Sequence, residues 1–123
     1  MAKRILLIED EPNIIEAIRF ILSRDGWAVD THSDGNTAIE AIKTRSPEII
    51  ILDVMLPNRS GYDILQELRA TEGISDTPVL MLTARGQVKD REMAEKLGAN
   101  RFMTKPFSNS EVLEEIRGLA SGG

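Results

Sequence analysis

The alternation of apolar runs with amphipathic stretches constrains the fold of this chain more than any other feature. Apolar runs predict β-strands at Arg4–Ile8, Trp27–Thr31, Glu48–Asp53, Pro78–Thr83 and Arg101–Thr104. The third and fourth runs are almost continuously apolar, which is typical of parallel strands that are covered on both faces. Between the runs, apolar residues return with the spacing of one helical face. This spacing is weakest from Gln87 to Leu97, where we expect the least firmly anchored helix.

Repeated strand–helix units predict one parallel sheet with helices on both faces. Right-handed crossovers leave few strand orders, and the flavodoxin-like order 2-1-3-4-5 is the commonest at this size. The fold prediction is therefore a doubly wound α/β domain with five strands and five helices. We expect it to occupy residues 1–120, with 121–123 as a frayed tail or the stub of a linker. In this order a crevice opens at the carboxyl ends of the first and third strands.

Polar side chains stand at the ends of four of the predicted strands. Glu9 and Asp10 follow the first strand, Asp53 ends the third, Thr83 ends the fourth and Lys105 follows the fifth. Taken singly, each has an ordinary explanation, since Asp often caps helices or forms turns. Because parallel strands end at one edge of the sheet, the same residues together predict a site with carboxylates, a hydroxyl and an ammonium group.

Carboxylates that lie within a few ångströms of one another repel, and the repulsion raises a pKa unless a cation lies nearby. Lys105 offsets one charge and leaves about −2, which a divalent ion matches. The site offers only oxygen ligands, so the predicted ion is Mg²⁺ or Mn²⁺. Such a cluster suits the transfer of a phosphoryl group onto a carboxylate.

Composition argues against several other classes of function. The formal net charge of −5 disfavours nucleic-acid binding by this domain itself. The absence of cysteine excludes disulfides, thiolate metal sites and cysteine nucleophiles. No apolar run approaches the ~20 residues of a membrane span and no leader pattern opens the chain, so we expect a cytoplasmic protein without membrane contact.

A more specific signal lies in four stretches, ILLIEDEP at 5–12, IIILDVMLPNRSGYDIL at 49–65, PVLMLTARG at 78–86 and GANRFMTKPF at 98–107. Together they resemble the receiver domain of two-component response regulators, most closely the OmpR/PhoB type, over essentially the whole chain. The resemblance implies a phosphoprotein in signal transduction that accepts a phosphoryl group on Asp53. The donor would be a partner histidine kinase or phosphotransfer protein, and the chain would not be an enzyme beyond this self-catalysed step.

The resemblance also implies a ligand set for Mg²⁺. Asp10 and Asp53 would bind the ion directly, together with the backbone carbonyl of Met55. Glu9 would reach the ion through a water molecule.

Further residues would contact the phosphoryl group or respond to it. Lys105 would pair with its oxygens, and the Lys105–Pro106 peptide would be cis. The hydroxyl of Thr83 would follow the new charge, and the ring of Phe102 would turn inward into the vacated space. The face formed by the fourth helix, fifth strand and fifth helix would then change its affinity for partners.

That face departs from the OmpR/PhoB pattern in its charges. Arg91 and Glu111 match the usual interface charges, whereas Arg101 and Glu115 reverse a pair that is acidic–basic in relatives. One hypothesis is a homodimer that uses the reversed pair and disfavours mixed dimers with ordinary relatives. The alternative is that these residues are solvated surface charges worth less than ~1 kcal/mol.

Other interpretations remain open at this stage. A hydrolase of the haloacid dehalogenase type also uses an Asp after a strand, but it needs a second Asp where this chain has Met55. A receiver-like binding module without phosphorylation is disfavoured by the complete set of site residues. Relatives of the OmpR/PhoB type continue into a DNA-binding domain, so the chain is either a stand-alone receiver, which we favour, or a piece of a longer protein. His32 is expected in a surface loop far from the acidic edge.

Overall fold

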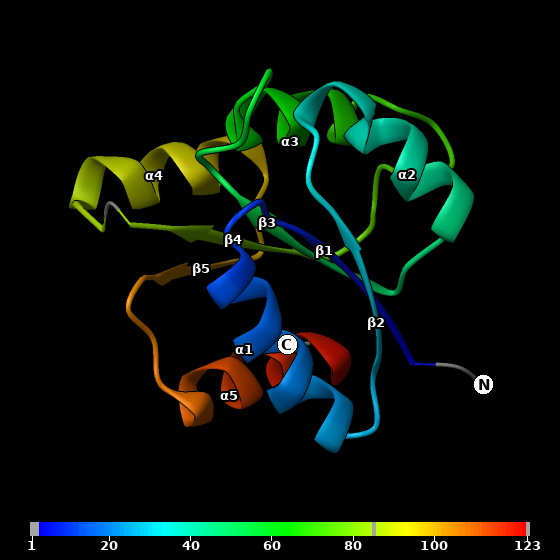
Figure 1. The fold of residues 1–123 in the computed structure, drawn as a ribbon. Helices are drawn as coiled ribbons and strands as arrows, with labels where there is room; N and C mark the ends of the chain where they lie inside the picture. Colours follow the sequence, from blue (N-terminus) through cyan, green and yellow to red (C-terminus); the bar gives the residue numbers. More distant parts are fainter. Residues whose placement is uncertain (1–2, 85, 123) are drawn as a thin grey trace.

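The computed structural model describes residues 3–84 and 86–122 and contains one five-stranded parallel sheet (Figure 1). Its strands are β1 (Arg4–Ile8), β2 (Ala28–His32), β3 (Ile49–Asp53), β4 (Val79–Thr83) and β5 (Arg101–Thr104). The spatial order is β2-β1-β3-β4-β5, which confirms the predicted topology. Three strands begin one residue later than predicted. In β2 this is because the N–H of Trp27 donates to the carbonyl of Leu22, and the ladder starts with Ala28 opposite Arg4.

The helices are α1 (Pro12–Arg24), α2 (Ala38–Arg45), α3 (Gly61–Arg69), α4 (Val88–Leu97) and α5 (Asn109–Ala120), and a short 3₁₀ helix, η1 (Gly35–Thr37), precedes α2. Helices α2, α3 and α4 cover one face of the sheet, and α1 and α5 cover the other (Figure 1). Local sequence explains several ends: Pro12 occupies the first turn of α1, and Ser108 with Glu111 forms the predicted capping box of α5. Gly98 ends α4 with φ 106°, a conformation that favours glycine.

Two apolar layers hold the helices on the sheet, because successive side chains of a strand point to opposite faces. Leu6 and Ile8 belong to the layer under α2–α4, whereas Ile5 and Leu7 belong to the layer under α1 and α5. Burial of each such side chain stabilises the fold by about 1.5–3 kcal/mol. Helix α4 contributes one fully buried residue, Ala94, which agrees with its weak apolar spacing. In residues 3–84 and 86–122, no helix has the length and apolar character needed to cross a membrane.

Candidate functional site at the carboxyl edge of the sheet

Acidic side chains gather where the carboxyl ends of β1 and β3 meet. Asp53 is the last residue of β3, and Glu9 and Asp10 directly follow β1. Each of the three places a carboxylate oxygen within 4.8 Å of the other two. Glu9 and Asp53 are buried, at 0% and 1% exposure, whereas Asp10 is exposed. A small ion or a phosphoryl group can therefore approach the buried pair from the side of Asp10.

Lys105 brings positive charge to this cluster from the end of β5. Its Nζ lies 2.6 Å from Oε1 of Glu11, 3.2 Å from Oε1 of Glu9 and 3.7 Å from Oδ2 of Asp53. The N–H of Lys105 donates to the carbonyl of Thr83 at 2.8 Å, which fixes the start of the loop beside β4. The peptide between Lys105 and Pro106 is cis. The shortest ion pair of Lys105 is thus with Glu11, a residue that the sequence analysis gave no role.

The electrostatics of the cluster change the pKa of two side chains. Burial and then the charge of Glu9 raise the pKa of Asp53, against the opposing effects of Lys105 and the N–H of Met55, and the net pKa is about 7. Burial lowers the pKa of Lys105, but the hydrogen bond with Glu11 and the charges of Asp53 and Glu9 outweigh it and raise this pKa overall. The site therefore carries more negative charge than its own cation neutralises.

The oxygens of the cluster fit a hard cation. Oε1 of Glu9 and Oδ2 of Asp53 are buried without a hydrogen-bond partner among the described residues. The other oxygen of Glu9, Oε2, accepts from the N–H groups of Asp10 and Glu11 at 3.2 and 3.0 Å. Oε1 of Glu9 and Oδ2 of Asp53 both face Lys105, at 3.2 and 3.7 Å, and a buried carboxylate oxygen that lacks hydrogen bonds is costly. Mg²⁺ or Mn²⁺ prefers carboxylate oxygens as ligands. The donor set therefore suits a divalent ion of this class.

Comparison with known protein families decides what kind of domain carries this cluster. Residues 5–117 match the response regulator receiver domain. The chain belongs to this family. Receiver domains bind Mg²⁺ at such an acidic cluster and interact with histidine kinases and phosphotransfer proteins, and they are generally not catalytic enzymes.

Relatives and solved structures agree with the family. The chain is 39% identical over 119 residues to the alkaline phosphatase synthesis transcriptional regulatory protein PhoP of Bacillus subtilis, covering 97% of this chain and 49% of that protein. It is 41% identical over 114 residues to the transcriptional regulatory protein DltR of Streptococcus agalactiae, covering 93% and 50%. Both are of the OmpR/PhoB type, and this chain spans about half their length.

A receiver domain of a sensor histidine kinase from Pseudomonas aeruginosa, solved with a magnesium ion coordinated in its active-site cleft, has the same fold. It superposes with a TM-score of 0.86 at 30% identity, covering 96% of this chain and 97% of that one.

Two further predicted residues of the receiver lie on β4 and β5. Thr83 ends β4, is 1% exposed and stands opposite Thr104 of β5. The ring of Phe102 is 5% exposed and packs in the layer under α2–α4, with the guanidinium carbon of Arg91 4.9 Å from its centroid. The ring is thus buried under Arg91, and Phe102 lines a surface pocket together with residues of α4 and α5.

The charged residues expected at the partner-binding face pair within their own chain. Nη1 of Arg101 lies 3.0 Å from Oε1 of Glu115 and links β5 to α5. Oε1 of Glu111 accepts from the N–H of Ser108 at 3.0 Å as part of the capping box, and Arg91 covers the ring of Phe102. Arg101 and Glu115 therefore already pair with each other, and a homodimer that used them would have to share or exchange this contact.

The expectation that His32 lies far from the acidic edge is wrong. His32 is the last residue of β2, and its carbonyl accepts the N–H of Glu9 at 3.0 Å. Its Nε2 lies 2.7 Å from Oγ1 of Thr37, so the ring turns toward η1. The reason is that β1 and β2 run parallel, so the carboxyl end of β2 lies at the same edge of the sheet as that of β1, where Ile8 stands opposite His32.

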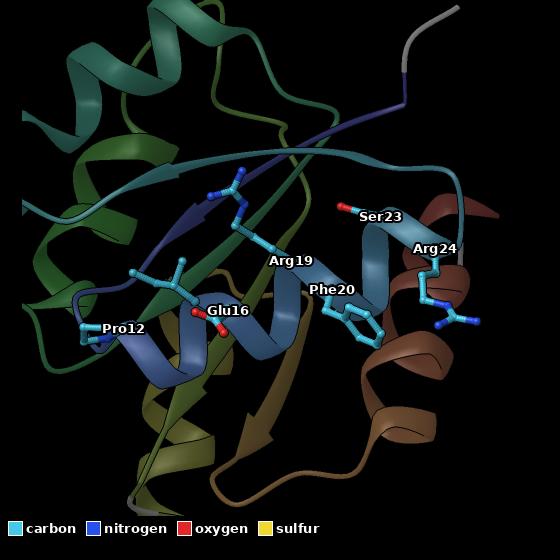
Figure 2. Close-up of a pocket in the computed structure, with 7 residues that line it drawn as sticks. Pro12, Glu16, Arg19, Phe20, Ser23 and Arg24 are labelled. Atoms are coloured by element: carbon cyan, nitrogen blue, oxygen red, sulfur yellow. The ribbon is translucent and has the colours of Figure 1, made fainter.

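The exposed face of α1 is a surface that sequence reasoning missed. Pro12, Glu16, Arg19, Phe20 and Arg24 line a shallow pocket along this helix (Figure 2). Phe20 is 60% exposed, and the guanidinium carbon of Arg24 lies 5.2 Å from its ring. The available signal was the position of Phe20, which falls outside the apolar stripe that faces the sheet. The face begins at Pro12, two residues after Asp10, so it adjoins the acidic cluster.

Proposed function

We propose that this chain accepts a phosphoryl group on Asp53 from a partner histidine kinase or phosphotransfer protein, with Mg²⁺ or Mn²⁺ bound. The observation that carries the proposal is the convergence of Glu9, Asp10, Asp53 and Lys105 around one edge, from strands far apart in the sequence. Phosphorylation then changes the face of α4, β5 and α5 and so controls partner binding.

In the transfer step, an oxygen of the Asp53 carboxylate attacks the phosphorus of the donor. A phosphorus–oxygen bond forms while the phosphorus–nitrogen bond to the donor histidine breaks, and its electron pair stays on the imidazole. The attacking group must be ionised, and burial opposes this by raising the pKa of Asp53 to about 7. Lys105 favours the ionised form, and a bound divalent ion supplies the further charge neutralisation that the transfer requires.

For the ion, we assign direct ligation to Asp10, Asp53 and the backbone carbonyl of Met55. We assign Glu9 an indirect role through water. Three contacts support this division for Glu9: its Oε2 already accepts two backbone N–H groups, and its Oε1 faces Lys105 at 3.2 Å. Asp10 is exposed, which suits a ligand that shares the ion with water.

For the phosphoryl oxygens, we assign Lys105 and Thr83 as partners. Nζ of Lys105 lies 3.7 Å from Asp53 but 2.6 Å from Glu11, so it exchanges part of its pairing with Glu11 for the phosphoryl group. Thr83 stands at the end of the strand that pairs with β3, and its hydroxyl follows the added charge.

The switch in this proposal is a shift between two positions of the Phe102 ring. In this structure the ring packs in the layer under α2–α4 and is covered by Arg91. Phosphorylation favours the position in which the ring turns inward, into the space that Thr83 and Lys105 vacate. Helix α4 is the element that responds, because it has a single fully buried residue. A coupling of about 1–3 kcal/mol changes partner affinity ~5- to 150-fold.

The proposal also covers the surfaces that bind partners and the bounds of the domain. The donor docks along α1, where exposed Phe20 offers apolar contact next to the acidic cluster. The α4–β5–α5 face supports a homodimer in which Arg101 and Glu115 take part. We assign residues 1–120 to the receiver and 121–123 to a frayed tail or the stub of a linker; residues 1–2, 85 and 123 lie outside the described residues. A cytoplasmic location and no nucleic-acid contact by this domain stay predictions from the sequence.

Intact-mass analysis after incubation with acetyl phosphate and Mg²⁺ tests the proposal. We expect a gain of one phosphoryl group, ~80 Da, in the wild-type chain and no gain in Asp53→Ala. The matched control is Asp63→Ala, which removes an exposed aspartate of α3 and should be modified like the wild type. A chain that takes no phosphoryl group from acetyl phosphate or phosphoramidate, with or without Mg²⁺, would overturn the proposal.

A further inference from the structure

The loop between β3 and α3, residues 54–60, is anchored at its base beside the phosphoacceptor. The N–H of Gly61 donates to the carbonyl of Val54 at 2.9 Å, and a Cβ on Gly61 would overlap the carbonyl of Asp53. Within the loop, the N–H of Met55 donates to Oδ1 of Asp53 at 3.3 Å. The position of the loop therefore sets a hydrogen bond of the phosphoacceptor carboxylate.

The other side of this loop is held by the connection between β2 and η1. Oδ1 of Asp34 accepts from Nδ2 of Asn58 at 3.0 Å and from the N–H of Asn36 at 2.9 Å. The N–H of Gly35 donates to the carbonyl of Pro57 at 3.2 Å. A Cβ on Gly35 would lie 2.6 Å from the carbonyl oxygen of Arg59, so only glycine permits this approach. Two connections that are distant in the sequence thus form one joined unit.

We propose that Asp34 is a positioning residue for the phosphoryl-acceptor site. Its hydrogen bond to Asn58 holds the β3–α3 loop, and the loop in turn keeps the N–H of Met55 on Asp53 and the carbonyl of Met55 in place for the ion. The inference rests on the proposed function, because the carbonyl of Met55 is a proposed ligand. Residues that orient metal ligands typically change metal affinity by about 10- to 100-fold when they are removed.

Mg²⁺ titration by calorimetry, together with the rate of phosphorylation by acetyl phosphate, tests this role in four variants. Asp34→Ala removes the acceptor, whereas Asp34→Asn keeps an acceptor oxygen and removes only the charge. We expect Asp34→Ala to weaken Mg²⁺ binding about tenfold and to slow phosphorylation, and Asp34→Asn to stay within about twofold of the wild type. Asn58→Gly removes the donor and permits the φ of 72° at this position, so it should match Asp34→Ala. The double variant Asp34→Ala/Asn58→Gly should be no weaker than either single one, since the two residues act through one contact.

The matched control is Asp25→Ala, which removes a half-buried aspartate whose Oδ1 accepts from Arg117 at 2.6 Å, at the far end of α1. It should bind Mg²⁺ like the wild type. Equal losses in Asp34→Ala and Asp34→Asn would reveal a charge effect and overturn the positioning role. So would wild-type affinity in both Asp34→Ala and Asn58→Gly; if Asp34→Ala does not fold, Asn58→Gly alone decides. A wild-type chain that binds no Mg²⁺ and takes no phosphoryl group would instead refute the proposed function.

Discussion

Replacement of Asp53 by Asn tests the electrostatics of the acidic cluster in metal-free buffer. Folding raises the pKa of Asp53 from 3.8 to about 7. Between these values the folded protein holds a proton that the unfolded chain has lost, so the free energy of unfolding falls as pH rises through this window. At about 1.4 kcal/mol for each pKa unit, the cost of folding with this aspartate reaches about 4 kcal/mol at pH 8.

Asparagine keeps the shape of the side chain and does not ionise, so Asp53→Asn should recover that free energy. We expect the variant to be more stable than the wild type by about 1–2 kcal/mol at pH 5 and about 4 kcal/mol at pH 8. Urea unfolding in EDTA measures the difference, followed by the fluorescence of Trp27, which is buried in the folded state. Glu72→Gln is the control, because it removes an exposed carboxylate and should change stability by less than about 0.5 kcal/mol at either pH.

The pH dependence carries the test, since many substitutions change stability at a single pH. A gain of equal size at pH 5 and pH 8, or no gain, would refute the reasoning. Above pH 7, saturating Mg²⁺ should reduce the difference in the free energy of unfolding between Asp53→Asn and the wild type. The ion binds the ionised form of the wild-type site and stabilises the folded state that contains it.

Four further variants, one of them a control, test other parts of the molecule. Phe20→Ala should slow phosphoryl transfer from a partner kinase but leave the rate with acetyl phosphate unchanged, because the exposed ring lies on α1 and outside the acidic cluster. Gly61→Ala should lower the free energy of unfolding by about 1–3 kcal/mol in urea, since its Cβ overlaps the carbonyl of Asp53. Arg69→Met should cost about 1–3 kcal/mol by leaving the carbonyls of Ser75, Thr77 and Gly98 without this donor, whereas Arg117→Met, at an exposed ion pair, should cost less than about 1 kcal/mol.

The fold was accessible from the sequence because its strongest signals are local. The runs at β3 and β4 are almost purely apolar, and both strands are buried along their whole length. Right-handed crossovers then restrict the strand order without any knowledge of side-chain contacts. The error in β2 arises at a boundary: Trp27 has the apolar character of a strand residue, but its N–H closes the end of α1. His32 was misplaced for a different reason: β2 runs parallel to β1, so its last residue lies at the edge of the sheet that carries the acidic cluster.

The candidate site also has a part that the sequence predicts and a part that it does not. That Glu9, Asp10, Asp53 and Lys105 meet follows from the positions of strand ends, which the topology determines. Which atoms pair depends on ångström-scale distances between loops, and a pattern of residue types does not contain these. The pair of Lys105 with Glu11 and the contact of Asp34 with Asn58 are of this second kind.

The ion pair between Arg101 and Glu115 within the chain changes what these charges can contribute to a homodimer. Both side chains are about one-third exposed, at 32% and 30%, so the pair is worth about 0–1 kcal/mol within the chain. A dimer that exchanges it for the same pair across the interface therefore gains almost nothing from these charges. In the proposed homodimer, the affinity would come from other contacts of the α4–β5–α5 face. In that proposed dimer the reversed charges would still affect selectivity, because a relative with the usual acidic–basic order would place like charges against them.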